Sequence, residues 1–534
     1  MEVLNSTGTM EGSVRSALRG RGGEVMSKTI GLDFGNYNVY MSCITDMDPE
    51  TRRGGTPIDL QDVAGSEGVP STYVLGKGGK PKLGMAALND RFSARGVNLL
   101  KRRMGEKVKV HAGRGREAVV DVDGAIVEVV SHCVRIANRV LESETGETTS
   151  CVALAHPVQF NPREVERLVA LVEDATLEDG THVKVVGTIA EPAAAALDYL
   201  SSDATLGSRD VVTALTMDLG AGTFDVALLS AYPEGRRDAA GSVRYYDCID
   251  SDGIADLGGN EFTMALYSLA LEKAGLEGVD DALMGEYLGK VEQAKIALTD
   301  ADEYEISFFD YDEGDDIDIV LTKAEFEQCT SGLLDRVVER TNALVARNAS
   351  VKVDVIVVTG GGGNMPMIQE AATRLVLPGV PVRSYRPSKA ISYGASRYYV
   401  DTHGEAVIKH TNRDLGVQFY IGSSLAQRVH VCIPAGSELP YVQADSVGSK
   451  TKNEGQAKSV FPVMRAKVEH PDPFHEDDWE KIGSLVYRHA EPVSRGTDLR
   501  SRLSIDELGM LHISCWAPER PQDGLQERPF SWQD

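Results

Sequence analysis

Two stretches with the same layout decide the fold: IGLDFGNYNVY at residues 30–40 and TMDLGAGTFDV at residues 216–226. Each reads as a strand, an Asp-x-Gly turn and a second strand, and therefore predicts a β-hairpin. Glycine at the turn lets backbone N–H groups approach a phosphate oxygen without a Cβ in the way, and the aspartate can hold a hydrated cation beside it. One such motif is typical of any hairpin. Two that face each other would clamp the phosphates of a nucleotide between two pseudo-symmetric lobes.

A third glycine motif follows a buried strand predicted at residues 355–359. It consists of four glycines, Gly360 to Gly363, before Asn364, Met365 and Pro366. A strand, a glycine loop and a helix start can bring the sugar and base of a nucleotide close to the backbone. A flexible loop is the alternative interpretation.

Strands and helices alternate around these motifs, which predicts an α/β architecture. Residues 151–155 and 212–217 are short apolar runs typical of buried strands. Asn161 precedes a proline and a helical apolar repeat, so we expect it to cap a helix. Thr322 and Glu325 fit a capping box at the start of a second helix.

An acidic stretch from Asp300 to Asp318 holds ten carboxylates interleaved with apolar residues. We expect a solvated hairpin with one buried face. A calcium site is the alternative, but the spacing matches no calcium loop.

The last third of the chain differs in character, because short strands there are separated by Gly-, Pro-, Asp- and Asn-rich turns. This pattern predicts an all-β sandwich. We expect the following organisation: a disordered leader at 1–27, a nucleotide-binding domain at 28–400 with lobes at about 28–210 and 211–400, a linker at 401–412, the sandwich at 413–520 and a polar tail at 521–534.

The composition excludes several classes of function. The net charge is −25, so phosphate-driven binding to nucleic acid is disfavoured. No apolar run is long enough to span a membrane and no signal peptide precedes the folded part. Seven scattered cysteines without a CxxC pair indicate reduced thiols rather than a disulfide framework or a metal site. We expect a cytoplasmic monomer that binds neither nucleic acid nor a membrane.

The three glycine motifs, in this order, resemble the ATPase domain of the seventy-kilodalton heat-shock chaperone family, the DnaK-like members of the actin-like ATPase superfamily. The similarity covers residues 28–400. It includes AGSEGVPSTYVLG through NLLKRRMG at 64–105, CVALAHPVQFNPREVERL through VVGTIAEPAAAALDYL at 151–200, GIADLGGNEF at 253–262, VEQAKIALT at 291–299 and ISYGAS at 391–396. The resemblance implies a two-lobed α/β domain with a duplicated ribonuclease H-like core.

The end of the chain resembles the family's peptide-binding β-sandwich less closely. TNRDLGVQFYIG at 411–422, HVCIPAGSELP at 430–440 and RSRLSIDELGMLHISCWAP at 500–518 carry this similarity. The family follows its sandwich with a helical lid, and we expect none here because the chain stops at Asp534. Without a lid, peptide would bind weakly and exchange quickly.

The resemblance also implies residue roles for hydrolysis of ATP to ADP and phosphate by in-line attack of water. The residues implied in catalysis are Asp33, Lys101, Glu191, Asp218 and Thr223, of which Asp33 and Asp218 would hold magnesium through water. The residues implied in binding ATP or ADP are Gly35, Asn36, Tyr37, Gly220, Ala221, Gly222, Gly258, Gly259, Glu292, Lys295, Thr299, Gly360, Gly361, Gly362 and Asn364. Pro157 would belong to an interlobe switch.

Some positions depart from the family pattern. Asn36 and Tyr37 replace two threonines, Asn364 replaces an arginine that stacks on adenine, and Ser388 replaces an aspartate. Loss of a cation–π contact weakens binding by about 0.5–2 kcal/mol, so we expect weak nucleotide affinity and slow hydrolysis or none. The linker lacks the family's run of leucines: Val407 and Ile408 could partly substitute, whereas Lys409 and His410 are poor docking residues.

Two hypotheses on function follow. One is an ATP-dependent chaperone that binds exposed peptide segments, with a J-domain protein and a nucleotide-exchange factor as possible partners. The other is a non-cycling, nucleotide-stabilised scaffold whose β-domain binds one dedicated protein. Sugar kinases and actin-like filament proteins share the core fold, but they lack the sandwich and the segment around Lys101.

Overall fold

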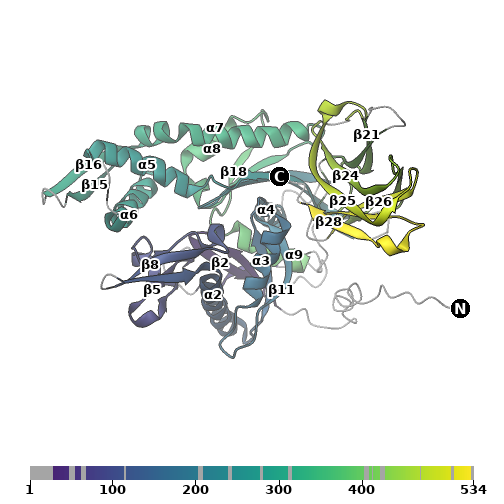
Figure 1. The fold of residues 1–534 in the computed structure, drawn as a ribbon. Coiled ribbons are helices and arrows are strands. Elements are labelled where there is room, and N and C mark those ends of the chain that lie inside the picture. Colours follow the sequence, from purple (N-terminus) through teal and green to yellow (C-terminus); the bar gives the residue numbers. More distant parts are fainter. Residues whose placement is uncertain are drawn as a thin grey trace.

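The computed structural model of the chain describes most residues from Lys28 to Phe530. The described residues are 28–46, 55–61, 68–113, 116–202, 209–237, 243–276, 279, 281–310, 315–401, 408–409, 411, 413–420, 427–468, 471–506 and 510–530. The expected leader therefore lies outside the described residues. Figure 1 shows two α/β lobes, one below the other in this view, and a β-domain beside the upper lobe.

The first lobe is built on a sheet of strand order β11-β10-β1-β2-β3, with β4 also paired to β2. The predicted hairpin is β1–β2, and β10 joins it in parallel on the other side of β1. Helices α2 and α3 pack on this lobe. Asn161 caps α3, as predicted, and its capping box with Glu164 was not predicted. The bounds are β1 Ile30–Phe34, β2 Asn38–Cys43, β3 Ile58–Asp59, β4 Val69–Pro70, β5 Tyr73–Leu75, β6 Pro81–Lys82, β7 Gly96–Val97, β8 Lys107–Gly113, β9 Arg116–Asp121, α2 Val122–Thr145, β10 Cys151–His156, α3 Pro162–Glu173 and β11 Lys184–Ala190.

The second lobe repeats this strand arrangement. Its sheet has the order β18-β17-β12-β13-β14-β19, in which the hairpin β12–β13 takes the place of β1–β2 and the parallel strand β17 takes the place of β10. The shared order supports the pseudo-symmetry expected from the two motifs. The bounds are β12 Val212–Leu219, β13 Phe224–Arg237, β14 Val243–Ile254, α5 Gly259–Ala274, α6 Asp281–Ala297, β15 Glu303–Asp310, β16 Asp315–Thr322, α7 Lys323–Arg347, β17 Val355–Thr359, α8 Pro366–Thr373, β18 Val382–Ser384 and β19 Ile408–Lys409.

The acidic stretch forms the expected hairpin, β15–β16, with one buried face. Ile306, Phe308, Ile319 and Leu321 are buried against the core of the second lobe. Thr322 closes the hairpin and caps α7 in the predicted capping box with Glu325. Apolar burial on one face therefore explains the interleaved pattern without an ion.

Two helices cross where the lobes meet, α4 (Glu191–Ser202) and α9 (Ala390–Asp401). Their contact is very close: a Cβ added at Gly394 would lie 1.8 Å from the carbonyl oxygen of Ala194. Only glycine permits that approach, and the alanine run of α4 forms the other side of it. The crossing thus depends on small side chains that the sequence places on both helices.

The β-domain is a sandwich of two sheets, as predicted. One has the order β21-β20-β24-β25 and the other β22-β26-β27-β28, with β23 paired to β26. Leu415, Phe461, Leu503 and Ile513 are among the residues buried between them. The bounds are β20 Leu415–Tyr420, β21 Gln427–Ile433, β22 Tyr441–Val442, β23 Val447–Lys450, β24 Gln456–Ala466, β25 Trp479–Val493, β26 Asp498–Ile505, β27 Leu511–Trp516 and β28 Gln526–Phe530.

The predicted polar tail at 521–534 is wrong for residues 521–530. A 3₁₀ turn, η7 (Pro521–Asp523), leads into β28, which pairs antiparallel with β27. Phe530 is buried against Gly483 of β25. This strand could not be predicted from the sequence, because its outward side chains are polar and its one buried residue gives no alternation of apolar and polar residues.

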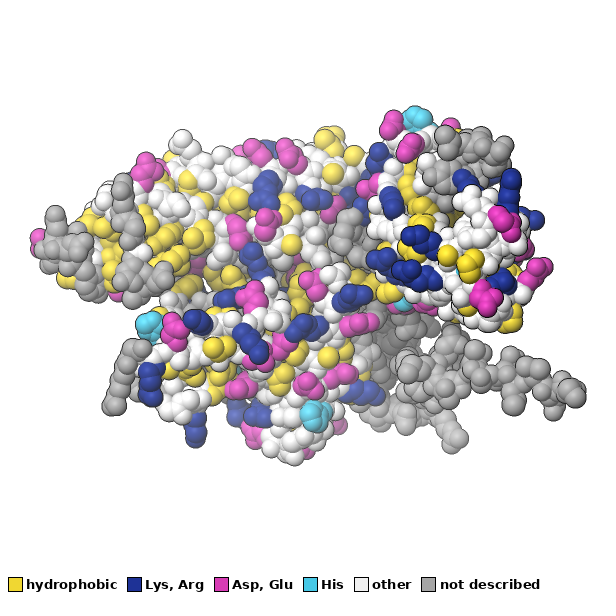
Figure 2. Space-filling model, viewed as in Figure 1, with side chains coloured by type: hydrophobic (Ala, Val, Ile, Leu, Met, Phe, Trp, Pro, Cys, Tyr) yellow, Lys and Arg dark blue, Asp and Glu magenta, His cyan; other side chains and the backbone are white. Residues whose placement is uncertain are grey.

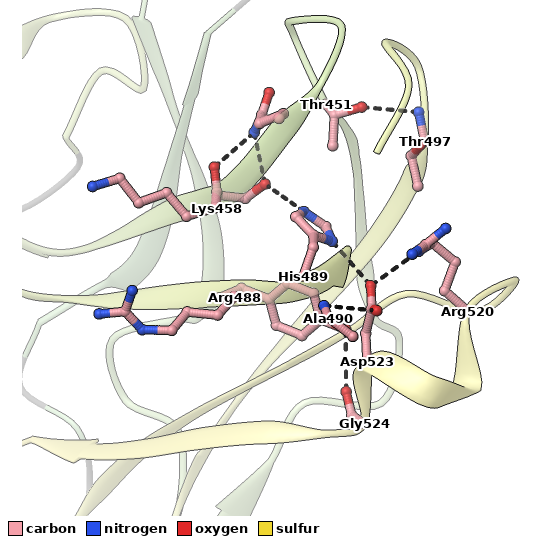
Figure 3. A network of polar contacts seen from close by, with 12 residues as sticks. Thr451, Lys458, Arg488, His489, Ala490, Thr497, Arg520, Asp523 and Gly524 are labelled. Atoms are coloured by element: carbon pink, nitrogen blue, oxygen red, sulfur yellow. Dashed lines mark hydrogen bonds and ion pairs between the residues drawn. The ribbon is translucent and has the colours of Figure 1, made fainter. Parts of the chain in front are cut away.

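A buried polar network ties η7 to the sandwich (Figure 3). The imidazole of His489 lies between Asp523, at 3.0 Å from Nδ1, and the hydroxyl of Ser459, at 3.3 Å from Nε2. Asp523 also accepts hydrogen bonds from Arg520 and from the backbone N–H of Ala490. All three members of this Ser–His–Asp group are buried, so the network holds structure together.

Part of the predicted linker is a strand. Residues 408–409 form β19, which extends the second-lobe sheet in parallel beside Asp247 and Cys248 of β14. Val407 and His410 lie outside the described residues. None of the seven cysteines forms a disulfide. In the part of the chain that is described, no helix is long and apolar enough to cross a membrane.

Candidate functional site

A cavity of about 310 Å³ lies between the two lobes. Every residue predicted to act in catalysis or nucleotide binding lines it, with the exception of Gly258. Gly258 instead lies behind the wall, where a Cβ would come within 2.5 Å of the backbone nitrogen of Gly222. The remaining lining residues are Asn38, Tyr40, Ile296, Met365, Pro387, Ser388 and Ile391. Of these the sequence pointed only to Met365, in the third glycine motif, and to Ser388, as a departure from the family pattern.

The glycine motifs form one end of this cavity. A Cβ at Gly222 would lie 2.5 Å from the Asn36 side chain of the opposite hairpin. Gly360 has a φ of +79°, and a Cβ there would lie 2.3 Å from Asp218 Oδ1. The two hairpin turns and the third motif therefore meet closely enough that side chains at these glycines would fill the space for a phosphate.

Charged groups converge at the same end. Asp33 is the penultimate residue of β1 and Asp218 is the penultimate residue of β12, so the repeated topology brings them together from the two lobes. The Lys101 Nζ atom lies 2.5 Å from Glu191 Oε1, and both side chains are almost fully buried. Lys101 stands on the 3₁₀ turn η3 (Leu100–Arg103), whereas Glu191 begins α4.

Asp225, on β13, belongs to the same group and was missed from the sequence. It is fully buried, and its Oδ1 atom accepts a hydrogen bond of 2.8 Å from the backbone N–H of Val158. The aspartate at the end of Gly-Thr-Phe-Asp was the available signal. The bond also connects the second lobe to the residue after Pro157, whose role as a switch remains a prediction.

Burial and crowding of acid raise the pKa values of these carboxyl groups. Burial, followed by the negative charge of Glu191, raises the pKa of Asp33 to about 7, and the same two causes raise the pKa of Asp225 to about 7. Burial and Glu191 also hold the pKa of Asp218 well above its usual range. Burial lowers the pKa of Lys101, but Glu191 and Asp33 more than offset this and the pKa is raised overall.

This donor set fits a cation held through water. The Oδ1 atom of Asp218 and the Oδ2 atom of Asp225 are buried without a hydrogen-bond partner. Four carboxylates surround one ammonium, so the site has an excess of negative charge. Within the described residues no three potential ligands are placed to bind a metal directly. Magnesium commonly keeps several waters and needs few direct protein ligands.

The other part of the cavity offers a mixed polar and apolar wall. Lys295 Nζ lies 2.9 Å from Glu292 Oε2 and donates to the hydroxyl of Thr263, which holds both α6 side chains in place. Beside them the side chain of Ile296 is 54% exposed. An exposed apolar side chain next to fixed polar groups is typical of a wall that receives a base and a sugar.

Comparison with protein families agrees with this geometry. The family model for Hsp70 protein matches residues 29–516. The chain belongs to the Hsp70 family. Hsp70 proteins combine a two-lobed actin-like ATPase domain with a β-sandwich, and they act as ATP-binding chaperones together with J-domain proteins and exchange factors.

The departures from the Hsp70 pattern now have a structural setting. The Tyr37 ring lines the cavity, so it narrows the site, and its hydroxyl donates to Asn260 Oδ1 of the second lobe at 3.3 Å. Arg91 stacks over the ring at 5.0 Å. Asn36 is buried and accepts a 3.3 Å hydrogen bond from the backbone N–H of Arg102. Both residues that replace the threonines therefore brace the loops around the phosphate end.

A second contact closes the cleft near Tyr37. Arg102 of the first lobe forms a 2.9 Å ion pair with Glu261 of the second. We call the pairs Tyr37–Asn260 and Arg102–Glu261 the interlobe clasp. Asn364 does not replace the lost arginine in stacking, because its amide donates to the carbonyl of Gly361 on its own turn.

Proposed function

We propose that this Hsp70 protein binds ATP with magnesium between its lobes and hydrolyses it slowly. The observation that carries the proposal is the buried Lys101–Glu191 pair beside Asp33 and Asp218, at the end of the cavity where the glycine turns meet. A fixed, buried ammonium can stabilise negative charge that develops on the γ-phosphate, because little water screens it.

The roles follow from position. Asp33 and Asp218 hold magnesium through water, and the metal when bound neutralises charge on the phosphates. Lys101 reaches the γ-phosphate while Glu191 keeps it oriented and helps to position the attacking water. Thr223 orients that water from the second hairpin. Catalysis of this kind depends on placement and electrostatics, so a few groups suffice.

The β-domain, on this proposal, binds extended peptide segments. Its sandwich exposes several apolar side chains, of which Val442, Phe474 and Leu525 are about 60% exposed (64%, 59% and 64%). The backbone pairing of β19 with β14 joins the connection between the domains to the ATPase sheet, which supports communication between nucleotide and peptide sites. Peptide-stimulated hydrolysis is the measurement that checks this part.

Single-turnover hydrolysis, measured beside the dissociation constants of ATP and ADP, tests the ATPase. Lys101→Ala should slow cleavage by about 10²–10³-fold, because it removes the charge that acts in the transition state. Nucleotide affinity should change by less than about tenfold, because the glycine turns and the α6 side chains that would bind the nucleotide are unaltered. Lys109→Ala, at a lysine whose side chain is 73% exposed on β8, is the matched control and should leave both unchanged.

The second candidate is a non-cycling scaffold stabilised by nucleotide, with its β-domain bound to one dedicated protein. The interlobe clasp favours it, because contacts that hold the cleft shut slow exchange. Tight binding of ATP without cleavage in the wild type would support the scaffold and overturn the ATPase. Cleavage that Lys101→Ala does not slow would overturn the assigned role of Lys101.

A further inference from the structure

A buried charge lies at the helix crossing, outside the cavity. Asp198, on α4, is fully buried within an otherwise apolar helix face. Its Oδ1 atom accepts a 2.9 Å bond from Arg397 of α9, and its Oδ2 atom accepts 3.0 Å bonds from Arg386 and from the hydroxyl of Tyr385. A carboxylate so deep is stable only when its partners are in place.

One of these partners controls the backbone beside the cavity. Arg386 has a φ of +40°, a left-handed conformation that is uncommon for a residue with a side chain. Its carbonyl accepts the backbone N–H groups of Lys389 and Ala390 and so begins α9. Its guanidinium stacks over the ring of Tyr393, at 4.9 Å, as well as binding Asp198.

The next two residues, Pro387 and Ser388, line the nucleotide cavity. Arg386, with its strained backbone, therefore connects a buried ion network to a segment of the cavity wall. Backbone held in a sparsely populated region persists only where its surroundings impose it, and it is found at ligand sites and switches.

We propose that Asp198 is a positioning residue for the nucleotide cavity. Through Arg386 it holds the left-handed turn that presents Pro387 and Ser388 to the nucleotide, and through Arg397 it holds α9 against α4. The wall of the site and the crossing of the lobes are thereby fixed by one carboxylate. This inference rests on the proposed binding of nucleotide in the cavity.

Two substitutions at Arg386 separate backbone placement from side-chain loss. Arg386→Ala removes the anchor and leaves a residue that disfavours positive φ, so we expect ADP to bind about tenfold more weakly in isothermal titration. Arg386→Gly removes the same side chain but accepts the conformation, so it should retain more affinity than Arg386→Ala. Alanine is also less stable than glycine at a residue with positive φ, so the melting temperature of each variant is measured beside its ADP affinity, and affinity that only follows the melting temperature overturns the positioning role.

Asp198→Asn completes the test. It should weaken ADP binding to a similar extent. In the double variant Asp198→Asn with Arg386→Ala, the fold-loss of ADP affinity should be smaller than the product of the two single losses, because both substitutions remove the same contact. Asp250→Asn is the matched control. It breaks another buried ion pair, with Arg347 at 2.7 Å, at a residue that does not line the cavity. It should lower the melting temperature and leave ADP affinity unchanged.

The outcomes are distinct. If wild type binds ADP and the Asp198 and Arg386 variants bind it within about twofold of wild type, the positioning role is overturned and the nucleotide site stands. If Asp250→Asn weakens binding equally, the effect is general destabilisation and the role is overturned. If wild type binds no nucleotide, both the inference and the proposed function fail. If Asp198→Asn does not fold, the order of the two Arg386 variants decides, because the Arg386 side chain is one-third exposed (33%).

Discussion

At the residue scale, the excess of buried acid around Lys101 sets how the protein responds to pH. Asp33 and Asp225, with pKa values of about 7 in the folded state, bind protons more tightly than the unfolded chain, where an aspartate titrates near 3.8. Their contribution to stability is complete below the unfolded value and is lost as the pH rises through about 7. Burial and then the charge of Glu191 raise both pKa values, and the charge of Lys101 opposes them.

We therefore expect the free energy of unfolding of the nucleotide-free ATPase domain to fall by roughly 1–4 kcal/mol between pH 5.5 and pH 8. Urea unfolding at several pH values, followed by far-ultraviolet circular dichroism, measures this. Asp33→Asn should reduce the slope, because the neutral amide has no proton to lose. A variant that keeps the wild-type slope would contradict the assignment to Asp33.

At the element scale, the last strand of the β-domain matters more than its composition indicates. β28 covers the side of the sandwich, with Phe530 against β25, and η7 supplies the carboxylate that pairs with His489. Loss of this segment would expose apolar core and leave a buried imidazole without its partner.

Truncation after Arg520 should thus destabilise the β-domain by about 2–5 kcal/mol relative to a chain that ends after Phe530. Tryptophan fluorescence during thermal unfolding isolates this domain, because all three tryptophans of the chain lie between residues 479 and 532. Both truncated chains keep Trp479 and Trp516, so their signals are comparable. Equal melting temperatures for the two would show that β28 contributes little.

At the scale of the whole molecule, the arrangement of the lobes would control the release of nucleotide from the proposed site. The lobes join at the α4–α9 crossing, and the interlobe clasp closes the cleft beside the phosphate end. Surface charges of both signs are interspersed over the lobes in the view of Figure 2, where several basic side chains also gather on the β-domain. The net charge of −25 thus does not describe every surface.

Opening the clasp should speed the release of ADP. Arg102→Ala and Tyr37→Phe each remove one contact between the lobes, and each should raise the dissociation rate about two- to fivefold, as expected for partly exposed pairs. Stopped-flow release of a fluorescent ADP analogue measures the rate. Arg103→Ala is the matched control, because Arg103 pairs with Glu106 within its own lobe. Release that is equally fast in Arg103→Ala would exclude a specific clasp.

The features predicted from short local sequence patterns agree best with the structure. The two Asp-x-Gly hairpins, the helix cap at Asn161, the capping box at Thr322 and the α/β and all-β regions follow from patterns a few residues long. These local predictions succeed because glycine turns, caps and apolar periodicity are local physical requirements. The residues that the family resemblance implied line one cavity, Gly258 excepted, and their roles stay predictions.

Only the tertiary structure decided which distant groups meet. Asp225 lies with the carboxylates of the cavity, and Tyr37 bonds to Asn260 across the cleft. Asp198 binds two arginines, and β28 completes a sheet with a single buried residue. The sequence by itself determined most of the elements and the family, and it predicted most of the residues that line the cavity. It did not determine these contacts, because contacts between residues far apart in the sequence depend on how the lobes and sheets pack. A local sequence pattern does not specify that packing.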